Sequence, residues 1–362
     1  MFIDQTPAPQ AAWQRLLGLT LLITLAFGGL MLVTALAQDL PLRDPDGLLG
    51  PSYIRLPLIA VGMIIADLVP RVGLRVWRSG RPVGKVVREV ARQRLSGRRL
   101  AVVAAGLTSF YISYVAYRNL KSFLPFVNQD LYDRWLVSND LWFTGGTQPG
   151  DMLHDLMGTG VSADLLSFTY MIFLPFVPAS LAAALVWSDD LSRGAWYASA
   201  LSLNWILGTL SYYSLPSLGP IYVEPYRFFD LPTTPVTGLQ DSLWGNRVEV
   251  LTDPHATQSV HGIAAFASLH TSIVFTAALV ATLCRMPSLV RWGMWVFFVL
   301  TALATVYFGW HYLLDVVAGV VLGGGAVWLA ALMTGRIGPL SRTRARELPT
   351  SVEARRTEVL SV

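Results

Sequence analysis

Long stretches without a charged residue limit what this chain of 362 residues can fold into. A helix needs about 20 apolar residues to cross the hydrocarbon core of a bilayer, and several stretches reach or approach that length. We therefore predict an all-α, polytopic membrane protein with about eight transmembrane helices. The predicted spans are residues 16–37, 53–70, 100–117, 165–188, 194–223, 262–284, 292–310 and 316–335. The span 53–70 is the weakest, because Arg55 and Asp67 interrupt it.

Composition excludes several other classes of protein. Charged residues make up 14% of the chain, against about 25% in a soluble domain. Soluble enzymes, disordered regulators and nucleic-acid readers are therefore poor interpretations. A transmembrane barrel alternates apolar and polar residues, whereas the apolar runs here are unbroken. The single cysteine, Cys284, excludes an internal disulfide and a cysteine metal site, and we expect it to be a buried or interfacial spectator.

Basic residues indicate how the chain is oriented, because loops that stay in the cytoplasm are rich in Lys and Arg. With eight spans, 20 of the 27 Lys and Arg residues fall on one side, ten of them in the segment 71–99. We read that segment as an amphipathic cytoplasmic helix that contacts anionic headgroups, and we place both termini in the cytoplasm of a cell-membrane protein. The first span is expected to be an uncleaved anchor, although Ala35-Leu36-Ala37 resembles a signal-peptide cleavage site.

This orientation divides the chain into three predicted parts and leaves two long outward segments. The parts are an N-terminal two-span region, 1–99, a catalytic transmembrane region, 100–335, and a disordered cytoplasmic tail, 336–362. Outward segment 118–164 mixes aromatic and acidic residues, which suits short interfacial helices. Outward segment 215–261 is rich in Pro and Gly, and we expect it to be an ordered loop or lid.

Histidines provide the first functional signal, because all of them fall on the outward side of this topology. They are His154, His255, His261, His270 and His311. His311 and Asp315 are four residues apart, so a helix would place them on one face. A carboxylate bonded to one ring nitrogen fixes the tautomer and raises the basicity of the other nitrogen. We leave His154 and His255 as surface residues and place His261 in a loop.

The segment Ser268-Leu269-His270 opens the sixth span. Ser268 is a plausible N-cap, and the free N–H groups and dipole of a helix start favour an anion. If the sixth and eighth spans pack together, His270 and His311 would flank one bound phosphate, one attacking and one protonating the leaving oxygen. A zinc site made by His261, His270 and His311 is an alternative, but the His311–Asp315 pair and the helix start suit phosphate better.

Two short motifs resemble the type-2 phosphatidic-acid phosphatase superfamily. They are Ser268-Leu269-His270 and Tyr307-(x3)-His311-Tyr312-(x2)-Asp315, and the similarity covers roughly residues 105–335. The form Ser-Leu-His, with Thr305 where the phosphatases have an arginine, is similar to the fungal inositol-phosphorylceramide synthase-like branch. The resemblance implies a six-helix core whose active site faces outward and needs no metal and no cofactor.

The resemblance also implies roles for individual residues. His311 would attack phosphorus, Asp315 would orient it, and His270 would protonate the leaving group. Ser268 and the N–H groups that follow it would hold phosphate oxygens, and Tyr307 belongs to the third motif. The first motif, Lys-x6-Arg-Pro, is missing from the outward side, so other cations must offset the phosphate charge. Our candidates are Arg118, Lys121 and Arg227, each of which has headgroup contact as its alternative role.

We therefore expect a membrane enzyme whose partners are lipids and not nucleic acid. The leading hypothesis is transfer of a phosphoryl headgroup, with inositol phosphate as the candidate, from a phospholipid to a lipid or glycolipid acceptor. A lipid phosphatase acting on phosphatidate or an isoprenyl phosphate is the alternative. A third hypothesis is a transporter or scaffold with the same fold, although transporters more often carry broken helices and charges at the bilayer midplane.

Overall fold

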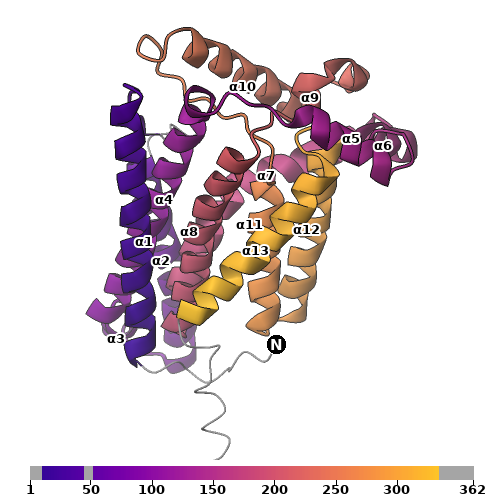
Figure 1. Ribbon diagram of the computed structural model, residues 1–362. Coiled ribbons are helices and arrows are strands. Elements are labelled where there is room, and N and C mark those ends of the chain that lie inside the picture. The colour runs from indigo at the N-terminus through magenta and orange to yellow at the C-terminus, as the bar shows by residue number, and fades with distance from the viewer. Residues whose placement is uncertain (1–9, 45–51, 334–362) are drawn as a thin grey trace, which may run out of the picture.

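A computed structural model describes residues 10–44 and 52–333, and this part of the chain is all-helical. Eight long helices form one bundle (Figure 1). They are α1 (Gln10–Ala37), α2 (Ser52–Ser79), α4 (Gly97–Val127), α7 (Val161–Trp187), α8 (Leu191–Ser214), α11 (Leu269–Leu283), α12 (Ser288–Tyr307) and α13 (Leu313–Met333). The predicted polytopic helical fold is confirmed. The predicted tail lies outside the described residues.

Six of the eight helices are long and apolar enough to cross a membrane: α1, α2, α4, α7, α12 and α13. Helix α11 is apolar but has only 15 residues. Helix α8 is more polar, and it packs against α1, α4, α7, α11 and α13. Its buried Asn204 bonds to Ser272 and, at 3.0 Å, to Thr276, both on α11. Polar side chains of α8 thus meet protein groups instead of lipid, which is why its sequence tolerates them.

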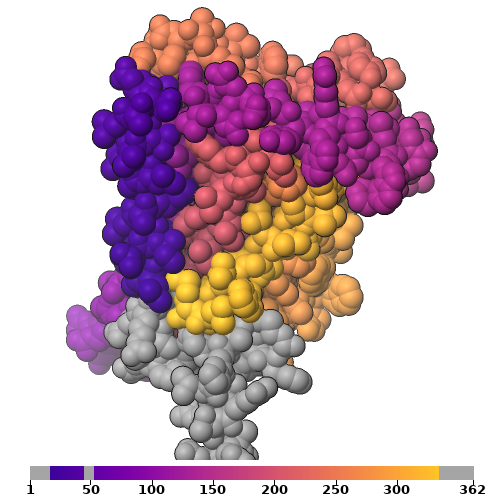
Figure 2. All heavy atoms as spheres, viewed as in Figure 1, coloured from indigo at the N-terminus to yellow at the C-terminus, as the bar shows by residue number. Residues whose placement is uncertain are grey.

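The shorter helices divide between the two ends of the bundle (Figures 1 and 2). Helix α3 (Val83–Arg94) lies at one end and is amphipathic as predicted, with Val86 and Val90 buried four residues apart. The other end carries α5 (Asp133–Phe143), α6 (Pro149–Met157), α9 (Pro220–Val223), the 3₁₀ turn η1 (Pro225–Phe228) and α10 (Pro235–Thr252). We call these the basic end and the site end.

Three segments differ from their predicted boundaries. Helix α2 continues to Ser79 and α4 continues to Val127, so the basic segment and the first outward segment are both shorter than expected. The second outward segment is not a loop throughout, because 235–252 forms the 18-residue helix α10. That helix has Pro235 in its first turn and a capping box made by Thr234 and Thr237. These residues specify a helix start, which counting Pro and Gly residues did not detect.

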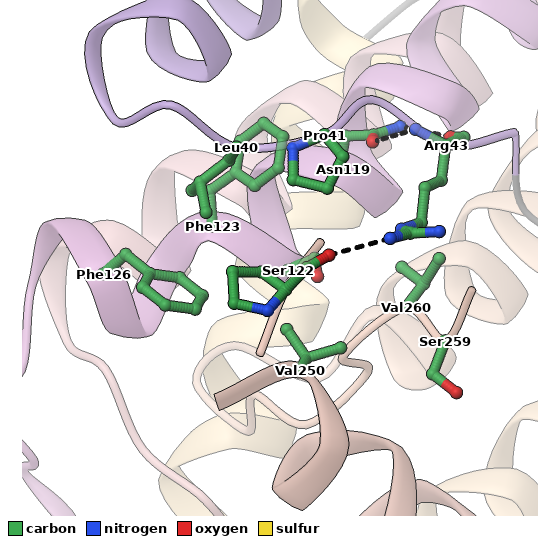
Figure 3. A pocket seen from close by; sticks show the side chains of 11 residues that line it. Leu40, Pro41, Arg43, Asn119, Ser122, Phe123, Phe126, Val250, Ser259 and Val260 are labelled. Atoms are coloured by element: carbon green, nitrogen blue, oxygen red, sulfur yellow. Dashed lines mark hydrogen bonds between the residues drawn. The ribbon is translucent and has the colours of Figure 1, made fainter. Parts of the chain in front are cut away.

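Arg43, just after α1, ties three segments together at the site end (Figure 3). Its backbone N–H donates to Asn119 Oδ1 on α4 at 2.8 Å, and its guanidinium donates to the carbonyl of Pro254 at 2.8 Å. The pocket that these groups border holds about 10 Å³, roughly the space of one water molecule. This junction therefore stabilises the packing of the three segments, and the pocket is too small for a ligand.

Helices α11 and α13 approach closely because α13 has glycine at two contact positions. A Cβ on Gly319 would lie 2.5 Å from the carbonyl oxygen of Ser268, and a Cβ on Gly323 would lie 2.5 Å from that of Ser272. A larger residue at either position would push the helices apart. This close packing brings the start of α11 next to the start of α13, where the predicted catalytic residues lie.

Candidate functional site

The loop between α12 and α13 carries His311. The carbonyl of Thr305, in the last turn of α12, accepts hydrogen bonds from the N–H groups of Trp310 at 2.9 Å and His311 at 3.2 Å. Gly309 supplies the positive φ of 68° that this turn requires. Thr305 thus holds the loop through its backbone, while its own hydroxyl donates to Ala302.

His311 and Asp315 lie together, as their spacing predicts. Nδ1 of His311 is 3.3 Å from Oδ2 of Asp315, and the N–H of Tyr312 donates to the same oxygen at 2.9 Å. Asp315 is fully buried and His311 is 5% exposed. Burial and the positive charge of Lys121 lower the pKa of His311 to about 3, so its ring is neutral at pH 7. A neutral ring held through Nδ1 leaves Nε2 as the atom that can attack.

His270 is the second residue of α11 and faces the same place. Its ring centroid lies 6.1 Å from that of His311. The ring stacks on Tyr170 at 4.6 Å and contacts Phe173 at 4.2 Å, both on α7, and Tyr170 also stacks on Trp310 at 5.5 Å. Aromatic rings therefore fix the orientation of His270 and limit the access of water to the space between the histidines.

Ser268 caps α11, as predicted. Its Oγ accepts a hydrogen bond from the N–H of Thr271 at 3.4 Å, and its own N–H donates to the carbonyl of Asp315 at 3.0 Å. Leu269 and His270 come first in the helix, so the helix provides no carbonyl for their N–H groups. A phosphate oxygen bound there would meet these two N–H groups and the positive end of the helix dipole.

Lys121 is the candidate cation of this site. It lies on α4, is 7% exposed, and its ammonium group is 4.7 Å from the ring centroid of Tyr212. Its charge acts on both His270 and His311. Arg118 lies one helical turn before it, and the Arg118 Nε is buried without a hydrogen-bond partner. Among the described residues, neither cation forms an ion pair. The two residues are three positions apart on α4, and no carboxylate in the described part of the chain balances their charge.

Arg227 and Tyr307, two other predicted site residues, are engaged elsewhere. The guanidinium of Arg227 is 2.6 Å from Asp151 and 3.1 Å from Glu224, so these carboxylates already balance its charge. The hydroxyl of Tyr307 donates to the carbonyl of Gly158 at 2.8 Å. The structure does not bring either side chain to the two histidines.

Asp133 and Asp140, on α5, hold the His311 loop in place and were not predicted as site residues. Asp133 accepts hydrogen bonds from the hydroxyl of Tyr312 at 2.9 Å and from the N–H groups of Leu218 and Gly219. Asp140 accepts from the N–H of Leu313 at 3.1 Å. Their spacing of seven residues puts both on one helical face, which is a signal that the sequence contains. The residues that they bind, Tyr312 and Leu313, are distant in sequence, so the sequence gave no indication of these contacts.

The other histidines occupy different positions. His154 is half-buried and not a surface residue, because its ring Nε2 is 2.8 Å from the carbonyl of Tyr307 and its ring packs against Phe228. His255 is exposed, as predicted. His261 lies in a loop but is 1% exposed, and its ring contacts Arg247. In the described part of the chain, no group of three His, Cys, Asp or Glu side chains has the geometry to hold a metal.

A model of the PAP2 superfamily, the type-2 phosphatidic-acid phosphatase superfamily, matches residues 146–329, just over half of the chain. The chain belongs to this superfamily. The match covers Ser268, His270, His311 and Asp315, and membership indicates phosphatase or phosphotransferase chemistry on lipid phosphoesters. No curated protein and no solved structure matches the chain.

Proposed function

We propose that this protein transfers a phosphoryl headgroup from a phospholipid to a lipid or glycolipid acceptor, at the extracytoplasmic face of the membrane. The observation that carries the proposal is the buried His311–Asp315 pair facing His270 across 6.1 Å, with Lys121 as an unpaired cation beside both rings. The similarity of Ser268-Leu269-His270 to the fungal branch supports inositol phosphate as the headgroup. The basic end, opposite the site end, supports the outward orientation.

The reaction follows from the roles of the two histidines. Nε2 of His311 attacks phosphorus, the bond from phosphorus to the diacylglycerol oxygen breaks, and protonated His270 gives its proton to that oxygen. The headgroup phosphate is then bonded to His311. A hydroxyl of the acceptor attacks phosphorus, the bond to His311 breaks, and His270 takes the hydroxyl proton. No proton is gained or lost overall. Lys121 and the N–H groups of Leu269 and His270 stabilise the charge on the phosphoryl oxygens.

The surroundings of His311 favour transfer over hydrolysis. Hydrolysis needs a water molecule in line with the phosphorus–nitrogen bond. His311 is 5% exposed, and the stacked rings of His270, Tyr170 and Trp310 cover the same space. A lipid alcohol would reach phosphorus along the apolar side of the site, where water is scarce.

The test is mass spectrometry of the purified protein in detergent with mixed lipid extract and ¹⁸O-labelled water. Transfer predicts an unlabelled headgroup phosphate on a new lipid, together with released diacylglycerol. His311→Ala and His270→Ala should each reduce turnover by about 10⁴-fold or more, while His255→Ala, an exposed histidine at the same end, should not. Asp315→Asn should lower turnover and leave residual activity, because the attacking ring remains.

Other outcomes would change the assignment. A labelled headgroup phosphate or labelled inorganic phosphate would mean that water resolves the intermediate, and the protein would be a lipid phosphatase. Near-normal activity of either histidine variant would remove that residue from its role. Absence of both products, with folded protein and intact histidines, would favour a transporter or scaffold.

A further inference from the structure

A cavity of about 240 Å³ lies at the site end, separate from the space between His270 and His311. The end of α4, the segment 216–218, α10 and the loop that leads to α11 surround it, and seven of its twelve lining residues are apolar. Its polar lining includes Arg247 and His261, and no carboxylate is among the described residues that line it. A cavity of about 150 Å³ holds benzene, so this cavity has room for a small organic molecule.

Arg247 brings to this cavity a positive charge that forms no ion pair within the described residues. Its side chain is half-buried, and its Nη1 lies 3.0 Å from Nε2 of His261. The carboxylate whose charge acts on it is that of Asp133, which instead accepts hydrogen bonds from the hydroxyl of Tyr312 and from two backbone N–H groups. A guanidinium stays charged inside a protein, so Arg247 retains its affinity for an anion.

His261 faces a hydrogen-bond donor at each of its ring nitrogens. Arg247 lies at Nε2, and the N–H of Ile263 lies 3.4 Å from Nδ1. Burial, followed by the charge of Arg247, lowers the pKa of His261 well below its ordinary value, so the ring is neutral and carries one N–H. Whichever nitrogen holds that hydrogen, it faces another donor. The residue is 1% exposed, and a buried donor without an acceptor lowers stability.

An anion in the cavity would remove this mismatch. With the hydrogen on Nε2, Nδ1 of His261 accepts from Ile263, while Nε2 donates to an anion that the Arg247 guanidinium also binds. Two donor atoms 3.0 Å apart suit the two oxygens of one carboxylate. A carboxylate also balances the single charge of Arg247, whereas a phosphate dianion would leave one negative charge unbalanced in a largely apolar cavity.

We propose that this cavity is a binding site for a small carboxylic acid with an apolar body. The carboxylate lies on Arg247 and His261, and the apolar body packs against Leu124, Leu218 and Ile263, which line the same cavity. This inference goes beyond the proposed function and does not depend on it, because neither His270 nor His311 takes part.

The wall of the cavity is tied to the loop that precedes α11. The carbonyl and the hydroxyl of Ser217, which lines the cavity, accept hydrogen bonds from the N–H groups of Ala265 and Phe266, both at 3.0 Å. A ligand that packs against Ser217 therefore restricts the motion of this loop. The amide hydrogens of 261–266 should exchange with solvent more slowly when the acid is bound.

Titration with 4-fluorobenzoate, followed by ¹⁹F NMR of the purified full-length protein in detergent, tests the site without turnover. The matched probe is 4-fluorobenzamide, which has the same ring and no charge. We expect the acid to bind about 10-fold more tightly than the amide, the gain of one charge-assisted contact. Arg247→Gln should remove that difference. Arg134→Gln, which changes an exposed arginine on α5, should keep it.

A second variant keeps the test decisive if Arg247→Gln does not fold. Leu251→Trp, on α10 one helical turn after Arg247, should fill the apolar part of the cavity and weaken acid and amide alike. Equal affinity of acid and amide for the wild-type protein, or an unchanged affinity in Leu251→Trp, would overturn the site. So would unchanged hydrogen exchange of 261–266 at saturating acid.

Two controls fix the ligand class and the location. Tighter binding of 4-fluorophenyl phosphate than of the acid, with the difference lost in Arg247→Gln, would overturn the assignment to a carboxylate. His311→Ala should bind the acid as the wild-type protein does, and a loss there would move the acid to the catalytic site. Because none of these measurements needs turnover, their failure is distinct from a failure of the transfer reaction in the ¹⁸O experiment.

Discussion

Buried cations occur at both ends of the bundle, but their surroundings differ. At the basic end, the guanidinium of Arg94 is 2.6 Å from Asp67 and 2.6 Å from Asp189, and it is 10% exposed. At the site end, Lys121 is 7% exposed and Arg118 has a buried Nε without a partner, and within the described residues neither meets a carboxylate. Carboxylates thus balance the charge of Arg94, whereas among the described residues none balances Lys121 or Arg118.

We propose that this difference separates a charge with a structural role, that of Arg94, from a charge with a functional role, that of Lys121. Removing an ion from water is expensive, and a partner of opposite charge offsets the expense only if it is well placed. Arg94 has such partners within the protein, and it joins α3 to α2 and to the turn before α8. Lys121 has none, so its burial lowers stability in the absence of an anion from outside. A bound phosphoryl group would provide that anion beside His270 and His311.

Lys121→Met tests this distinction with the largest expected effect. Turnover should fall by about 10²–10³-fold, as for the loss of one group that stabilises transition-state charge. The folded protein should become more stable by about 1–3 kcal/mol, because a buried, unpaired charge is replaced by an apolar side chain of similar length. Enzyme assays and denaturant unfolding in detergent give the two values.

The matched control is Lys85→Met on α3, where the lysine is exposed. It should change neither turnover nor stability appreciably. Loss of stability in Lys121→Met would show that Lys121 is structural, and would remove the contrast between the two ends.

Arg94→Ala should have the opposite pattern. It leaves Asp67, which is 8% exposed, without its closest cation, and breaking a buried ion pair by removing one partner destabilises a protein by about 3 kcal/mol. Turnover by the protein that remains folded should be unchanged, because α3 lies at the end away from the site. Denaturant unfolding of this variant, beside Arg88→Ala as an exposed control, measures the effect. A loss of turnover without a loss of stability would contradict the assignment.

Local sequence patterns predicted the helices well where an uncharged run of residues forms a helix in an apolar environment. The uncharged runs coincide with the long helices, because a lipid-facing surface requires apolar residues all along it. Helix α8 was predicted from its uncharged run as well. Its polar side chains are nevertheless buried against other helices, and this packing holds it in the bundle. Helix α10 was missed because its Pro and Gly content was read as loop, while Thr234 and Pro235 at its start specify a cap.

The candidate site was predictable only in its local parts. His311 with Asp315, and Ser268 with His270, are close in sequence, and each pair lies at the start of one helix, with one member just before it and one in its first turn. Lys121 was selected by elimination, as an outward cation. The contacts of Asp133 and Asp140 with the His311 loop join residues about 170–180 positions apart. Long-range contacts leave no periodic pattern in a single sequence.

Asp140 gives the smallest and most specific test, because it links pH to the packing of α5 on the His311 loop. Burial raises the pKa of Asp140 to about 7, although the N–H of Leu313 favours its ionised form. The folded state therefore binds a proton that the unfolded state releases near pH 4. The stability that this proton contributes is complete below pH 4 and is lost as the pH rises to about 7.

Asn at this position keeps an acceptor for the N–H of Leu313 and cannot titrate. The melting temperature of the wild-type protein minus that of Asp140→Asn should therefore fall from pH 4 to about pH 7 and stay level above it. Other titrating groups are common to both proteins and cancel in the difference. The exposed Asp130→Asn variant, measured in parallel, is the control for the substitution itself. If the difference for Asp140→Asn were flat, Asp140 would be ionised over the whole pH range tested, and a charged contact would hold α5 to the His311 loop. A second negative charge would then lie near Asp315, and the site would depend more strongly on a cation such as Lys121.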